Sequence, residues 1–233
     1  MRKVDRAGVL ADFQGACTDL VARFDRLVAS VSTTPTSNGD ISFLATQSFL
    51  SLFVSFERFC SDLVLAYMNA DFSKYQEDLA NRIDASIKGK FNPATAALVK
   101  FTPKAHVSVS ELEEFVDPTG WNLTFPTVTK LKEFATKSLI EQHADRINAI
   151  TLPEARLIDS ARAIRDFIAH QSRGSKERMN TYLSEIEIGG QNTYLGRGAN
   201  DVRVVGVYLK AVHGGEMRLH RYAQGLLAIA ARM

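Results

Sequence analysis

The chain has 233 residues, 45% of them hydrophobic, which is enough for a packed core. Its 28 basic and 26 acidic side chains leave a net charge of +2. This balance argues against a polycationic nucleic-acid-binding protein, so any RNA contact requires a local basic patch. No run of 18 apolar residues is present, and no apolar run follows the charged N-terminus. We therefore expect no membrane partner, no signal peptide and a cytoplasmic location.

Two long helices are predicted first. Apolar residues recur at helical spacing in two stripes, which are Leu10, Phe13, Cys17, Leu20, Phe24, Leu27 and Val31, then Phe49, Phe53, Phe56, Cys60, Leu63 and Tyr67. The polar run 32–40 separates them, with Pro35 and Gly39 as helix breakers. This pattern predicts an antiparallel pair in a helical bundle. Glu57 lies beside the second stripe, where it either marks the edge of the buried face or points into a site.

The two cysteines lie on these stripes, so we expect buried free thiols in a reducing compartment. A disulfide between Cys17 and Cys60 would require the two helices to be neighbours. Two cysteines in a chain of this length do not form a disulfide scaffold.

Residues 72–150 are predicted to be an insertion packed on the bundle, so that 1–233 form one domain. Helices are expected over 72–87, from Asn92-Pro93 through Val99, and from Val128 to about His143 with Thr127 as N-cap. Between them, residues 121–125 are a short extended piece, and loops and turns are expected at Pro103, Pro118, Gly120 and Pro126.

The following helix begins near Pro153-Glu154, since proline suits a first helical turn. Its buried stripe is Leu157, Ala161, Ile164 and Ile168, and its polar side carries Asp159, Arg162, Asp166 and His170. Gly174 is the expected C-cap, and another helix covers about 175–183. The fold class predicted from these elements is all-α.

The C-terminal segment begins after a loop predicted at Gly189-Gly190 and 196–200. A heptad pattern then predicts helix, broken at Gly214-Gly215, with the stripe Val202, Val205, Leu209, Val212, Leu219, Ala223, Leu226 and Ala230. Residues 202–212 are rich in β-branched side chains, so a short strand is the alternative there.

The segment Arg162-Ala-Ile-Arg-Asp-Phe-Ile-Ala-His170 carries the strongest candidate chemistry. A guanidinium binds phosphate bidentately and an imidazole moves protons near neutral pH, so Arg165 and His170 suit binding or cleavage of a phosphodiester. Five residues correspond to about 140° of helical rotation, so a second helix would help to complete the site. A two-fold dimer would bring two arginines and two histidines into one cleft. The alternative is a solvated salt-bridge face formed by Arg165, Asp166 and His170.

Other familiar motifs are absent from the sequence. It contains no G-x-x-x-x-G-K-[ST], H-E-x-x-H, C-x-x-C or G-x-S-x-G pattern. Glu216 and His220 are four residues apart, but no further metal ligands accompany them, and His213 and His220 are expected at the surface or core edge. We expect no metal and no cofactor.

At the Arg165–His170 segment the chain resembles the HEPN superfamily, whose signature is an arginine, usually a polar residue next, and a histidine four to six positions further on. Arg165-Asp166-Phe-Ile-Ala-His170 fits with four intervening residues, and the flanking Ala163-Ile164 and Ile168-Ala169 are also similar to the family form.

Two further segments support the resemblance. Residues 55–59 look like the corresponding helix in the RiboL-PSP-like branches, and Gly120–Pro126 is similar to an inserted segment of some standalone members. Ser172 stands where the toxins paired with minimal nucleotidyltransferases carry a tyrosine, so the resemblance does not extend to that branch.

The resemblance implies an up-and-down helical bundle, a homodimer with a composite active site and metal-independent endoribonuclease activity. The RNA 2′-hydroxyl attacks the adjacent phosphate and leaves 2′,3′-cyclic phosphate and 5′-hydroxyl ends. His170 is then the general acid or base, Arg165 stabilises the transition state, and Asp166 orients one of them. Glu57 is an auxiliary residue, and the RNA backbone contacts are assigned to Arg162, Arg173, Lys176 and Arg178.

The leading hypothesis is therefore a HEPN ribonuclease acting in a toxin–antitoxin pair or in antiphage defence, with RNA and a cognate antitoxin or defence-complex protein as partners. The alternative is a non-catalytic HEPN module that binds RNA, a nucleotide or a partner protein. A third interpretation is a helical interaction protein whose motif is accidental.

Overall fold

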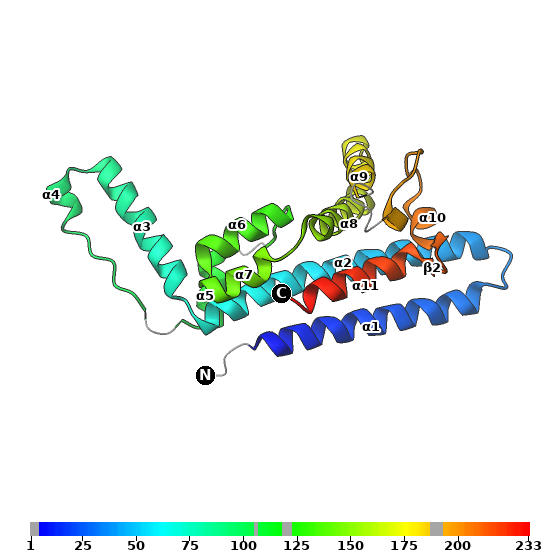
Figure 1. The fold of residues 1–233 in the computed structure, drawn as a ribbon, viewed down its shortest axis with the longest axis horizontal. Coiled ribbons are helices and arrows are strands. Elements are labelled where there is room, and N and C mark those ends of the chain that lie inside the picture. Colours follow the sequence, from blue (N-terminus) through cyan, green and yellow to red (C-terminus); the bar gives the residue numbers. More distant parts are fainter. Residues whose placement is uncertain (1–4, 105–106, 118–122, 187–192) are drawn as a thin grey trace. The chain divides into compact units, whose positions relative to one another are not determined.

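The computed structural model describes residues 5–104, 107–117, 123–186 and 193–233, and these are almost entirely helical (Figure 1). The prediction of an all-α fold is confirmed; the described strands are two residues each. Two compact units are present, residues 1–9 with 60–149 and residues 10–59 with 150–233. The prediction of one domain with an insertion is not tested by this division. No helix in the described ranges is both long enough and apolar enough to cross a membrane.

The two long N-terminal helices are confirmed as α1 (Arg6–Val31) and α2 (Ser37–Ala70). All six apolar positions of the second stripe are buried, whereas only three of the first stripe are, namely Phe13, Cys17 and Phe24. The helices contact each other through Phe13, whose ring centroid lies 5.7 Å from that of Phe56. Figure 1 shows them running in opposite directions. Gly39 was wrongly predicted as a breaker, since α2 begins before it, directly after the turn at Pro35.

Both cysteines are buried and neither forms a disulfide, as expected. Burial raises the pKa of the Cys17 thiol to about 11, so this thiol stays protonated at neutral pH.

In the unit of residues 1–9 and 60–149, the described residues form α3 (Ser73–Lys90), α4 (Pro93–Ala96), α5 (Val109–Val116), α6 (Val128–Ser138) and α7 (Glu141–Asn148). Thr127 caps α6 as predicted. Three predictions were wrong here. The helix expected over 128–143 is two helices, the helix after Pro93 ends at Ala96, and α5 lies where loops were expected. A capping box of Ser108 and Glu111 starts α5.

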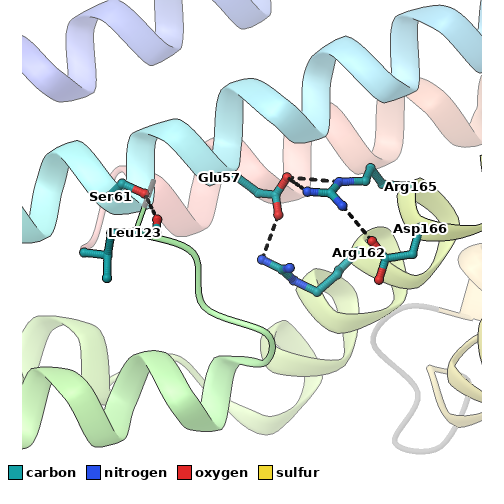
Figure 2. A network of polar contacts seen from close by, with 6 residues as sticks. All are labelled: Glu57, Ser61, Leu123, Arg162, Arg165 and Asp166. Carbon is teal, nitrogen blue, oxygen red and sulfur yellow. Dashed lines mark hydrogen bonds and ion pairs between the residues drawn. The ribbon is translucent and has the colours of Figure 1, made fainter. Parts of the chain in front are cut away.

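Part of the predicted extended piece at 121–125 lies outside the described residues. The described end of it includes Leu123, whose carbonyl oxygen accepts a hydrogen bond from the Ser61 hydroxyl (Figure 2).

The unit of residues 10–59 and 150–233 adds α8 (Leu152–His170) and α9 (Arg173–Glu185). A capping box of Thr151 and Glu154 starts α8, with proline in its first turn as expected. The predicted C-cap at Gly174 was wrong. Gln171 ends α8 in the left-handed conformation, at φ 47°, and Gly174 lies in the first turn of α9. Ser172 caps α9 and permits this sharp connection.

The C-terminal elements are a 3₁₀ turn η1 (Thr193–Leu195), α10 (Val205–Lys210), β1 (Val212–His213), β2 (Glu216–Met217) and α11 (Arg218–Ala230). The segment 202–212 therefore includes the short helix α10 and the first residue of β1, with Gly214-Gly215 forming the hairpin turn. The loop at 196–200 is present, while the predicted Gly189-Gly190 turn lies outside the described residues.

A hydroxyl network ties these elements into the core. The Tyr222 hydroxyl lies 3.3 Å from the Ser160 oxygen and 3.1 Å from the Tyr208 oxygen, so α11, α8 and α10 are connected through it. Gly206 of α10 lies close against the α2 backbone. A Cβ atom at this position would come within 2.1 Å of the Ser42 carbonyl oxygen.

Candidate functional site

The candidate site is built around Glu57, which α2 directs toward α8 (Figure 2). Its carboxylate accepts two hydrogen bonds from Arg165 on oxygen Oε2, 3.1 Å from Nε and 2.6 Å from Nη2. Its other oxygen, Oε1, lies 2.8 Å from Nη2 of Arg162. One glutamate therefore joins two arginines that lie one helical turn apart on α8, and only 10% of its side chain is exposed.

The arginines are fixed by more than this carboxylate. The Arg162 guanidinium lies 5.8 Å above the centre of the Phe53 ring, a cation–π contact. Arg165 donates from Nη1 to Asp166 at 2.8 Å. Three of the five N–H groups of Arg165 are thus directed at carboxylates, and one hydrogen on each terminal nitrogen is left for a further acceptor. No described residue takes these two hydrogens.

The carboxylates of the cluster stabilise the positive charge of Arg165. Burial by itself lowers the pKa of Arg165, but the hydrogen bonds and charge of Glu57, with the charge of Asp166, outweigh it and raise the pKa above its usual value. Arg165 remains a cation, with 24% of its side chain exposed. The four groups Glu57, Arg162, Arg165 and Asp166 sum to zero charge, so the cluster is neutral but strongly polar.

His170 is the last residue of α8 and is exposed. Within the described part of the chain, its imidazole makes no hydrogen bond or ion pair. The structure therefore brings Arg165, Asp166, Arg162 and Glu57 together but leaves His170 outside their network. The predicted polar side of α8 is half-buried at Arg162 and Asp166 and open to solvent only at the histidine.

The other predicted RNA contacts lie on α9, which packs against α8. Arg173 and Arg178 are exposed, and Lys176 is half-exposed. Arg173 donates to Glu177 at 2.7 Å, and this hydrogen bond raises its pKa. Arg162 differs from these three because its guanidinium contacts Glu57 rather than solvent.

Two further histidines, His213 and His220, have other neighbours. His220 lies 2.8 Å from Asp25 of α1, and Glu216 accepts a hydrogen bond from Gln224 instead of facing His220. No group of three or more potential metal ligands occurs among the described residues. His213 lies in the hairpin, where the charges of Arg218 and Arg221, with partial desolvation, lower its pKa.

The contact of Glu57 with both arginines was not predicted from the sequence. The available signal was a charged residue beside the apolar stripe of α2, next to the buried Phe56. Such a residue needs a buried cation as partner, but the sequence does not show which of the basic residues supplies it.

Comparison with protein-family models, with curated proteins and with solved structures finds no match for this chain. The likeness to the HEPN superfamily therefore stays a prediction from the motif.

Proposed function

We propose that the chain is a metal-independent endoribonuclease of the HEPN type, with its reactive groups near the C-terminal end of α8. The observation that carries the proposal is the contrast within one helix. Arg165 is held by Glu57 and Asp166, while His170 is exposed at the last position. A fixed cation and an open imidazole supply charge stabilisation and proton transfer, the two functions that phosphodiester cleavage requires.

The proposed reaction is an internal transfer on RNA. The 2′-oxygen forms a bond to the adjacent phosphorus, and the bond from phosphorus to the 5′-oxygen of the next nucleotide breaks. His170 takes the proton of the 2′-hydroxyl or gives one to the leaving 5′-oxygen. The two remaining N–H groups of Arg165 hold the phosphoryl oxygens as negative charge develops. The products carry 2′,3′-cyclic phosphate and 5′-hydroxyl ends.

In this proposal Glu57 is a positioning residue. It fixes Arg165 through two hydrogen bonds, from Nε and Nη2, that converge on one carboxylate oxygen and restrict the orientation of the guanidinium. Arg162 assists by neutralising the other carboxylate oxygen, so we assign it to the support of Glu57. RNA backbone contacts are left to Arg173, Lys176 and Arg178 on α9.

A two-fold homodimer would complete the site. Each chain supplies one histidine of the motif, whereas the reaction uses both a general base and a general acid. An isologous contact that places two α8 ends side by side supplies two imidazoles and two guanidiniums. We further propose that the activity serves a toxin–antitoxin pair or antiphage defence, restrained by a partner protein.

The test is RNA cleavage in EDTA with end-group analysis of the products. Wild-type protein should produce cyclic-phosphate ends, and His170→Ala and Arg165→Ala should produce none while remaining folded. His213→Ala removes an imidazole outside the site and is the matched control. Equal cleavage by the wild type and both site variants would overturn the proposal. Toxicity on expression that His170→Ala relieves would support the role in defence.

One observation favours a second candidate, a non-catalytic module that binds RNA, a nucleotide or a partner protein. No described residue orients the His170 imidazole, whereas acid–base catalysis depends on its orientation. This candidate predicts a complex with RNA or a partner protein and no new RNA ends, even in the wild-type dimer.

A further inference from the structure

The segment from Gln76 to Lys104, called the arm below, differs from the rest of the described chain in its exposure. It consists of most of α3, the short α4 and an irregular return (Figure 1). None of its described side chains is buried; Tyr75 and Val107 are the nearest buried residues on either side. Four large apolar residues in it are exposed, namely Phe91, Leu98, Val99 and Phe101, and Leu98 reaches 82%.

The base of the arm is well defined. The Gln76 side chain donates to the Lys104 carbonyl oxygen at 2.9 Å and accepts from the Lys104 amide at 2.6 Å. The Lys104 ammonium also contacts Glu111 at 2.6 Å, and these interactions with those of Ser108 lower the pKa of Glu111 to about 2. Specific contacts therefore join the two ends of the arm. The arm is a defined element, and its described side chains are exposed or half-exposed.

The distal part of the arm is purely cationic. Residues 85–104 contain four lysines and no aspartate, glutamate or arginine. Lys88 contacts Asp84 and Lys104 contacts Glu111. Lys90 and Lys100 are exposed and form no ion pair or hydrogen bond with the residues that the structure describes. In a chain of net charge +2, this segment is a local basic patch of the kind that attracts a polyanion.

Each of these two lysines directly precedes an exposed phenylalanine. The dipeptide Lys-Phe occurs at 90–91 and again at 100–101, and the rings are 56% and 38% exposed. A nucleotide of a single strand presents a flat base and a phosphate next to it. Aromatic rings stack on unpaired bases and ammonium groups bind phosphates, and both interactions tolerate any sequence.

We infer that the arm binds single-stranded RNA, with Phe91 and Phe101 as stacking platforms and Lys90 and Lys100 on the backbone phosphates. The charge of residues 85–104 is complementary to a polyanion, and the ring beside each free cation matches the chemistry of a nucleotide. A basic helix that lies on a membrane separates its charged and apolar faces over many turns. In residues 91–101, by contrast, the only helix is the four-residue α4, so RNA fits them better than a lipid surface.

The choice of RNA as the ligand rests on the proposed function, but the binding does not require cleavage. The measurement is therefore made on full-length His170→Ala protein, by fluorescence anisotropy with a labelled poly(U) oligonucleotide. Lys90→Gln/Lys100→Gln should make the negative slope of log K against log salt shallower by about 1.4, at about 0.7 per phosphate contact. Phe91→Leu/Phe101→Leu should weaken binding by about tenfold or more.

Two matched controls accompany these variants. Lys130→Gln/Lys137→Gln removes the same charge from α6, and Phe43→Leu removes an exposed ring from α2; both should bind as the parent does. In full-length His170→Ala protein with an unsubstituted arm, RNA containing 4-thiouridine should cross-link within 90–101. That experiment holds even where a variant folds poorly.

Parent-like RNA affinity in both arm variants, or cross-links only outside the arm, would overturn the inference. So would RNA binding that survives in the arm variants while binding to vesicles of phosphatidylcholine and phosphatidylserine in equal parts is lost. If wild-type protein cleaves RNA and the arm variants bind it unchanged, RNA binding by the arm is refuted and the proposed function is not. Arm-dependent binding without cleavage refutes only the proposed function.

Discussion

The cluster on α8 and the arm both present cations, but the two regions treat them in opposite ways. Arg162 and Arg165 are half-buried and share the carboxylate of Glu57. Lys90 and Lys100 are exposed, and no described carboxylate contacts them. Since a buried charge is stable only when paired, the first arrangement fixes geometry, whereas the second leaves charge free for an external partner. The paired arginines of α8 therefore suit precise positioning of a bound group, and the exposed lysines of the arm suit general attraction of an anion.

The largest effect is expected for Arg165→Lys. A lysine keeps the charge but lacks the planar fork of N–H groups. It therefore cannot donate twice to Glu57, contact Asp166 and hold a phosphate at the same time. RNA cleavage should fall by about 100-fold or more, the cost of losing a transition-state donor. Arg173→Lys on α9 is the control, with cleavage close to wild type. Activity retained by Arg165→Lys would mean that charge alone matters on α8.

Glu57→Ala tests the same contrast through stability. It leaves two half-buried guanidiniums without their shared carboxylate, and should lower the free energy of unfolding by about 3 kcal/mol in urea titrations. Glu57→Gln should cost less, because its amide oxygen still accepts from one arginine. The control is Glu177→Ala, which breaks an ion pair with Arg173 that is exposed on both sides. A loss of unfolding free energy as small as that of the control would mean that Glu57 contributes no more than an exposed ion pair.

Gln171→Gly tests the left-handed backbone at the end of α8. Gln171 has a left-handed backbone, which costs an L-residue about 1–2 kcal/mol, and glycine removes that cost but loses more entropy on folding. We expect a net gain of about 0.5 kcal/mol in calorimetry. Gly174→Ala should also stabilise, since a Cβ there meets nothing within 4 Å. Destabilisation by Gln171→Gly would mean that the glutamine side chain itself supports the turn.

The smallest effect is expected for Lys90→Gln/Lys100→Gln. Neither side chain has a partner among the described residues, so the free energy of unfolding should change by less than about 0.5 kcal/mol. Thermal and urea unfolding should therefore match the parent protein while RNA affinity falls. A clear loss of stability would show that these lysines support the fold and would remove the contrast with α8.

Much of the helical framework was predictable because burial imposes a period on the sequence. The stripe from Phe49 to Tyr67 predicted α2, and the proline at 153 predicted where α8 starts. The interruption between α6 and α7 was missed because Leu139 and Ile140 are apolar and continue the pattern. For α5, nearby prolines suggested loops, although Ser108 and Glu111 form a capping box that was readable in advance.

The candidate site was predictable in its parts and not in its connections. Arg165, Asp166 and His170 followed from the spacing of their chemistry along one helix. The contact of Arg165 with Glu57 spans 108 positions in the chain, and only the packing of α8 against α2 determines it. The end of α8 was misplaced because glycine is the usual residue at a left-handed cap, whereas the chain adopts that conformation at Gln171.

The contact of Gly206 with Ser42 bears on how relatives of this chain can be recognised. Any side chain at position 206 would collide with a backbone carbonyl, and no choice of rotamer avoids a backbone atom. A descendant lineage that lost the proposed catalytic residues would still need this glycine to keep α10 against α2. We therefore expect position 206 to vary less over evolution than His170, and to be the better anchor when distant relatives are aligned.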